Sequence, residues 1–209
     1  MTRCFRLLLC VLFGAALCSK AIAEPEADVL VALSEAIGGK FSVLSYAVAD
    51  LDQDGQKDWV GVVKIERTAG PGTRLYVVGR KTDGAKVAAM SREIAYMDCA
   101  GTCGVEILSA KAGNFFVRHY SRGGWGAAGL ITQFALRGSR WQAIGQKRTN
   151  VDAQLDQEET TDKNLLTGEY KSVAVSGGMS GDPKAARVKK GVRAKQKPLW
   201  LEAFDPVYF

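Results

Sequence analysis

The sequence predicts a mainly β domain, in which antiparallel strands follow one short N-terminal helix. Three observations support this fold class. Short apolar segments with a period of two recur along the chain, only one segment has a helical period, and 23 glycines supply turns. The topology is open between a sandwich, an open barrel and a partial propeller-like meander. No repeat of the length that a complete propeller needs is evident.

Residues 1–23 have the pattern of a cleaved secretory signal peptide. Arg3 and Arg6 precede an apolar run, Leu7–Leu17, that is too short to span a bilayer. A small-x-small motif ends the segment. We therefore expect export to the periplasm or the extracellular space, and a single mainly β domain over residues 24–209.

Removal of the signal peptide changes the composition of the chain. It takes away three of the five cysteines, three basic residues and no acid, so the formal net charge falls from +6 to +3. This small charge argues against a nucleic-acid partner. No later segment is apolar enough to span a membrane. A lipid anchor at Cys18 and an uncleaved anchor are alternatives, and Leu17 before Cys18 argues against the first.

The first predicted element of the mature chain is a helix over Pro25–Ile37. Proline suits the first helical position. Leu30 and Leu33 lie on one apolar stripe with Ile37. Gly38-Gly39 ends the helix, which we expect to cap the core.

After Lys40 the period changes to two, and the remaining predicted elements are strands. Asp83-Gly84, the stretch Lys111–Asn114 and the sequence RGSR at 137–140 each separate two such segments and predict hairpin turns. The predicted strands are Phe41–Ala49, Trp59–Glu66, Arg74–Arg80, Lys86–Ser91, Val105–Ala110, Phe115–Tyr120, Leu130–Leu136, Trp141–Lys147, Glu169–Ser176 and Val192–Lys197.

The densest chemistry lies between the first two predicted strands, where the pattern D-x-D-x-D-G-x-x-D occurs. Carboxylates at alternate positions converge when a loop curls around a hard cation, and Gly55 permits the sharp turn. A polar hairpin turn that binds nothing is the alternative. The expected ligands of a structural Ca²⁺ are Asp50, Asp52, Asp54, the backbone carbonyl of Gln56, and Asp58.

An EF-hand does not fit this loop, because its twelfth position would require a bidentate Glu and Gly61 stands there. The predicted flanks are also strands rather than helices. Over Val48–Val63 the loop resembles the calcium hairpins of FG-GAP and VCBS-type repeats. That resemblance implies a β-flanked calcium site, of which this chain holds a single copy.

The sequence DCAGTCG places Cys99 and Cys103 in a short loop. In an oxidising compartment we expect them to form a disulfide that stiffens the loop. A redox pair would favour two intervening residues rather than three. The same loop could also present a recognition surface, as in some periplasmic lysozyme inhibitors.

The segment Phe115–Gly129 combines aromatic and basic residues with glycine. The predicted strand places Arg118 and Tyr120 on one face, and Arg122 and Trp125 follow in a glycine-rich stretch. Such residues are typical of a contact site for a glycan or a protein partner. The alternative is that Trp125 folds back over the core.

A basic segment, Lys184–Lys197, contains lysine and arginine but no acid. On an edge strand these residues would prevent pairing between molecules. They could also attract an anionic envelope polymer or an acidic protein. We expect the final segment, KPLWLEAFDPVYF, to dock on the domain because it is apolar.

Residues 99–171 resemble a set of uncharacterised secreted bacterial β proteins. The motifs that carry the resemblance are CAGTCG, FFVRHYSRGGW and the late NLLTGEY. It implies a periplasmic or secreted β domain and no particular activity. Asn164 and Thr167 would then form a turn, since their side chains bond to nearby backbone.

These features favour a calcium-stabilised binding domain over an enzyme. His119 is the only histidine, and no nucleophile-elbow pattern occurs. The expected partner is another envelope protein or a glycan. The alternatives are an inhibitor or immunity protein that plugs an envelope-acting enzyme with the cysteine loop or the Trp125 loop, and a hydrolase.

Overall fold

A computed structural model describes residues 25–94, 102–124, 126–177, 184–194 and 197–205. The predicted signal peptide, Cys99 and Trp125 lie outside these ranges. No helix among the described residues is long and apolar enough to cross a membrane.

The chain forms two antiparallel sheets and one short α-helix, which confirms the predicted mainly β fold class. The four-stranded sheet has the order β1-β2-β3-β4, and the seven-stranded sheet has the order β11-β10-β9-β8-β7-β6-β5. Each sheet is therefore a meander. The elements are α1 (Ala27–Ile37), β1 (Phe41–Ala49), β2 (Asp58–Ile65), β3 (Gly72–Lys81), β4 (Gly84–Met90), β5 (Thr102–Lys111), β6 (Asn114–Gly123), β7 (Gly126–Arg137), β8 (Arg140–Asp152), β9 (Gln157–Asn164), β10 (Glu169–Ser176), β11 (Lys184–Val192) and a 3-10 helix, η1 (Leu201–Ala203).

The four-stranded sheet is covered on both faces. Its strand β2 is buried at almost every residue, and successive residues of a strand point to opposite faces, so both faces must be packed. Helix α1 packs on one face, where Val29 and Leu33 meet Trp59 and Tyr76. The opposite face packs against β5–β8 and the C-terminal segment. The large side chains of this second core are Leu51, Leu75, Phe115, Phe134, Trp141, Leu201 and Phe204.

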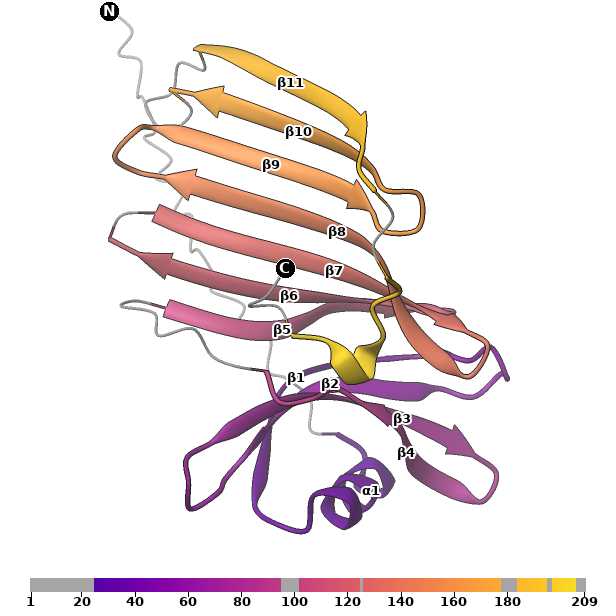
Figure 1. Cartoon of the computed structure of the whole chain (residues 1–209). Coiled ribbons are helices and arrows are strands. Elements are labelled where there is room, and N and C mark those ends of the chain that lie inside the picture. Colours follow the sequence, from indigo (N-terminus) through magenta and orange to yellow (C-terminus); the bar gives the residue numbers. More distant parts are fainter. Residues whose placement is uncertain (1–24, 95–101, 125, 178–183, 195–196, 206–209) are drawn as a thin grey trace, which may run out of the picture.

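Strands β9, β10 and β11 extend past the four-stranded sheet as the far end of the larger sheet (Figure 1). Among the described elements, these three strands make substantial contacts only with β8 and with one another. Strand β9 is absent from the prediction because its sequence, QEETTDKN, contains no apolar residue. Hydrophobic alternation therefore marks strands that bury a face and misses this one.

Two predicted boundaries are wrong. The last strand is not Val192–Lys197 but β11, which pairs with β10 and ends at Val192. Arg193 donates its N–H to the carbonyl of Gly168 at the turn before β10, and residues 193 and 194 belong to no strand. The helix begins at Ala27 rather than Pro25, with Glu26 as its N-cap.

Other local predictions are confirmed. Gly38 ends α1 in the left-handed conformation (φ 65°) and donates its N–H to the carbonyl of Ser34. The described part of the C-terminal segment, residues 197–205, docks on the domain, since Leu201 and Phe204 are buried. Asn164 accepts the N–H groups of Leu166 and Thr167, so the predicted turn is present.

Candidate functional site

Strand β6 carries three of the predicted partner-binding residues on one face. Val117 and His119 point into the core, so the alternating residues Arg118, Tyr120 and Arg122 lie on the outer face of the seven-stranded sheet. The fourth predicted residue, Trp125, lies outside the described ranges.

A groove of about 370 Å³ runs over this outer face along β6, β7 and β8. We call it the cationic groove. Its floor is shallow because β7 places Ala127 and Gly129 there, and a Cβ atom added at Gly129 would meet nothing within 4 Å. Its lining residues are Arg118, Tyr120, Ser121, Arg122, Ala127, Ala128, Gly129, Ile131, Lys147, Thr149 and Val151.

Strand register brings the two sides of the groove together. Tyr120 on β6 pairs with Gly129 on β7, which pairs with Thr149 on β8. In the next row, Arg118 pairs with Ile131 and Ile131 with Lys147. Side chains directly opposite one another in antiparallel strands share a face. Two strand spacings make the groove about 10 Å wide, and Arg118 to Arg122 spans about 13 Å along β6.

The three cations of the groove differ in their partners. Arg118 forms an ion pair with Glu106, and its guanidinium lies 5.3 Å from the centroid of the Tyr120 ring. Arg122 and Lys147 are exposed, and neither makes an ion pair within the described part of the chain. Arg122 and Lys147 can therefore both reach a ligand, although Lys147 has the carboxylate of Asp162 directly opposite it on β9.

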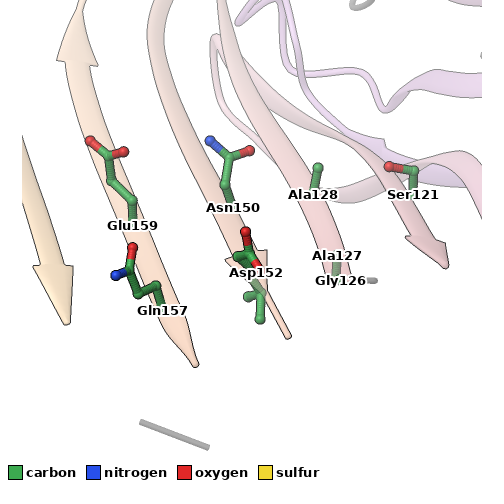
Figure 2. Close-up of a pocket in the computed structure, with 9 residues that line it drawn as sticks. Ser121, Gly126, Ala127, Ala128, Asn150, Asp152, Gln157 and Glu159 are labelled. Carbon is green, nitrogen blue, oxygen red and sulfur yellow. The ribbon is translucent and has the colours of Figure 1, made fainter. Parts of the chain in front are cut away.

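A second hollow, of about 460 Å³, lies near the ends of β7, β8 and β9, and its polar side chains come from the opposite face of the sheet (Figure 2). Asn150 and Glu159 stand side by side there on β8 and β9. Its acids already have partners: Glu159 accepts the hydroxyl hydrogen of Ser172 at 2.7 Å, and Asp152 accepts the N–H of Leu155 at 3.0 Å. This hollow therefore offers fewer free charges than the cationic groove.

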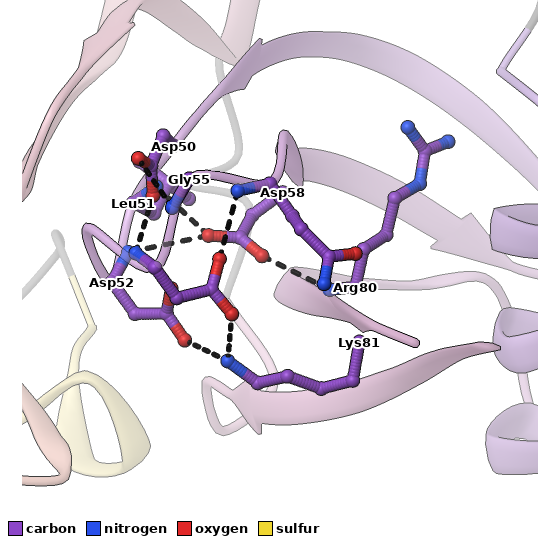
Figure 3. A network of polar contacts seen from close by, with 9 residues as sticks. Asp50, Leu51, Asp52, Gly55, Asp58, Arg80 and Lys81 are labelled. Atoms are coloured by element: carbon purple, nitrogen blue, oxygen red, sulfur yellow. Dashed lines mark hydrogen bonds and ion pairs between the residues drawn. The ribbon is translucent and has the colours of Figure 1, made fainter. Parts of the chain in front are cut away.

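The acidic loop, residues 50–58, lies between β1 and β2 and is closed by Asp58 (Figure 3). Asp58 is 2% exposed. Its carboxylate accepts the N–H groups of Leu51 at 2.8 Å, Asp52 at 3.2 Å and Arg80 at 3.0 Å. This one side chain therefore holds the loop to both its own hairpin and β3.

The remaining acids shape the loop and engage a lysine. Asp50 accepts the N–H groups of Asp54 and Gly55, each at 3.0 Å. The ammonium of Lys81 lies 2.5 Å from Asp52 and also pairs with Asp54 (Figure 3). Hydrogen bonds to Asp52 and Asp54 raise the pKa of Lys81, and the bond from Lys81 lowers the pKa of Asp54.

Three of the four predicted carboxylate ligands are placed to hold a cation, and the backbone carbonyl of Gln56 stays a predicted ligand. One oxygen from each of Asp50, Asp52 and Asp58 lies within 4.8 Å of the others. Asp54 lies outside this group and interacts with Lys81 instead. A set of carboxylate oxygens suits Ca²⁺ better than a transition metal.

Two other predicted features lie away from the groove. His119 is buried on the core face of β6, and burial lowers its pKa against the opposing effect of Asp205. Cys103 lies on β5, opposite Ser121. Because Cys99 is outside the described residues, the disulfide and the inhibitory role of its loop stay predictions.

The chain matches no family model, and neither the curated proteins nor the solved structures include a match to it. The resemblance to secreted β proteins therefore stays a prediction, and the site is argued from its own geometry.

Sequence reasoning missed Lys81, Gly129 and Lys147. Lys81 is 29 residues from Asp52 in the chain. Lys147 ends the predicted strand Trp141–Lys147, and the predicted hairpin with Leu130–Leu136 does not indicate that Arg118 lies beyond that strand. No local signal identifies these residues, because strand register alone brings them to the acidic loop and the cationic groove.

Proposed function

We propose that the protein is an exported binding domain whose ligand lies in the cationic groove. The observation that carries the proposal is a single groove, lined by Arg122, Lys147 and Tyr120 over a floor of small residues, in which both cations are exposed. Ligand sites combine apolar surface with a few placed polar groups, and this groove has that composition.

Binding is favoured over catalysis by the position of the single histidine. His119 is buried on the core face of β6, while the groove lies on the other face. A general base must come within hydrogen-bond reach of the reacting group. A ligand in the groove therefore has no histidine beside it.

The acidic loop serves this domain as a structural calcium site. Asp50, Asp52 and Asp58 supply the oxygens, and the ion competes with the ammonium of Lys81 for Asp52. Leu51, inside the loop, is fully buried in the core between the two sheets. Ordering the loop therefore also orders the core on which the seven-stranded sheet rests.

The groove is tested by filling it. Gly129→Leu places a side chain between Tyr120 and Thr149 without an initial clash. Val188→Leu is the matched control, because Val188 lies in the same row on the far strand β11 and is 53% exposed. Wild type and both variants are tested against neutral oligosaccharides, acidic oligosaccharides, peptides and lipid vesicles.

We expect at least one class of these ligands to bind wild type and Val188→Leu equally and to bind Gly129→Leu at least about tenfold more weakly. Both variants should melt within about 2 °C of wild type, since neither alters the core. If no class of ligand shows selective loss in Gly129→Leu, the groove is not the binding site and the proposal fails.

A further inference from the structure

We propose that the ligand of the cationic groove is an anionic carbohydrate, meaning a sugar chain that carries carboxylates or phosphates. This inference rests on the proposed binding function and specifies its ligand. The observation behind it is a groove that places free cations at both sides of an apolar and aromatic floor.

The charge of the groove selects the sign of the ligand. Its lining includes Arg118, Arg122 and Lys147 but no acid. The acids that flank it on the same face are Glu106, which is paired with Arg118, and two carboxylates on β9, where Asp162 lies opposite Lys147 and Glu158 opposite Val151. The groove itself therefore carries an excess of positive charge. An arginine guanidinium matches carboxylate and phosphate with two parallel hydrogen bonds, and a lysine adds a point charge. A neutral ligand would gain no charge–charge attraction from these three side chains.

The floor selects a ligand with apolar as well as polar faces. Tyr120, Ile131 and Val151 are half-buried and expose apolar surface between the cations. The C–H face of a sugar ring can pack on such a floor while its charged substituents face the rim. Tyrosine suits this role, because its ring is apolar and its hydroxyl is polar.

The groove also has a wall that holds its aromatic ring in place. A Cβ atom added at Gly104 would lie 2.7 Å from the Tyr120 hydroxyl, so the ring lies across Gly104 on β5. The guanidinium of Arg118 covers the same ring. Thr149, on the opposite side, offers a hydroxyl that is shared with Thr160 at 3.3 Å. Sugar hydroxyls therefore find polar partners on both sides.

The dimensions of the groove favour rings over long chains. At about 10 Å by 13 Å, it is broad, short and open at the top. A long acyl chain would stay largely in water on this surface, so an anionic lipid gains little from the apolar floor. A short acidic carbohydrate can cover the floor and reach the cations at the same time.

The test measures binding of the full chain to an oligogalacturonate, to the same oligosaccharide with every carboxyl methyl-esterified, and to a phosphorylated oligosaccharide. The variants are Lys147→Gln and Arg122→Gln. Lys171→Gln is the matched control, because Lys171 lies in the row of Lys147 on the same face but two strands outside the groove. Binding to anionic lipid vesicles is measured in the same way, as the alternative anionic ligand.

We expect an acidic oligosaccharide to bind at least about tenfold more tightly than the methyl ester, and more weakly as salt is raised. Lys147→Gln and Arg122→Gln should each weaken this binding about tenfold, while Lys171→Gln leaves it unchanged. Tighter binding of the carboxylated or of the phosphorylated probe identifies which anionic sugar the groove takes.

The failures of the two proposals are distinguishable. If Gly129→Leu abolishes binding of the methyl ester, a peptide or vesicles, but no acidic oligosaccharide binds, the binding function stands and the anionic-carbohydrate inference is wrong. The inference is also wrong if Lys171→Gln weakens acidic oligosaccharide binding as much as Lys147→Gln. If Gly129→Leu affects no ligand, the groove itself is excluded.

Discussion

In the acidic loop, four carboxylates lie within residues 50–58 and accept hydrogen bonds from backbone N–H groups or from Lys81. In the cationic groove, Arg122 and Lys147 come from two different strands and remain exposed. The carboxylates that are close together in the sequence thus find hydrogen-bond partners within the fold. The residues that are dispersed in sequence are left open to a partner.

The two regions also differ in how they relate to the core. Leu51 and Asp58 in the loop are buried, and a Cβ atom added at Gly113 would lie 2.7 Å from the side chain of Gln53. The loop therefore rests against the turn between β5 and β6 and links the two sheets. The cationic groove covers only the outer face of one sheet. The acidic loop thus supports the scaffold, whereas the side chains of the cationic groove are open to a ligand.

The largest effect that this comparison predicts is at Asp58. Asp58→Ala leaves three backbone N–H groups near the core without their acceptor. We expect it to lower the free energy of unfolding by about 4 kcal/mol, measured by urea denaturation. Asp54→Asn is the control, because Asp54 is exposed, and should have a far smaller effect. Equal effects of the two substitutions would contradict the role of Asp58 as the closing residue.

Calcium should have the next largest effect. For a Kd of about 0.1 mM, about 1 mM calcium adds about 1.4 kcal/mol of stability. EGTA should therefore lower the Tm by about 3–5 °C, measured by thermal unfolding. Asp52→Ala should abolish the difference, and Lys81→Met should preserve it while tightening calcium binding, because the competing ammonium is gone. Identical melting curves with and without calcium would rule out the structural calcium site.

The smallest predicted effect is at His119, which lies on the core face of β6, opposite the face that lines the cationic groove. Burial lowers the pKa of folded His119 below the unfolded value of about 6.5. As the pH falls through 6.5, the unfolded chain binds a proton that the folded chain does not, so stability is lost on acidification. Urea unfolding at about pH 7.5 and 5.5 should show this loss in wild type and less of it in His119→Gln. An unchanged pH dependence in the variant would mean that His119 is not held neutral in the core.

Much of the fold could be predicted from the sequence because its signals are local. Asp83-Gly84 is a hairpin turn, and β1 spans the predicted Phe41–Ala49, since alternating apolar residues and turn chemistry depend only on neighbours in the chain. Strand β9 could not be predicted in this way. Its polar residues bury little surface, and its pairing with β8 and β10 makes it a strand.

By itself, the sequence determined the mainly β class, the loop that gathers its carboxylates and the basic and aromatic character of β6. Only the tertiary structure decided that Lys81 reaches the acidic loop and that Lys147 faces Arg118 across β7. The physical reason is strand register. Hydrogen bonding between distant strands sets which side chains share a face, and a shift of one residue would turn Lys147 away from the groove.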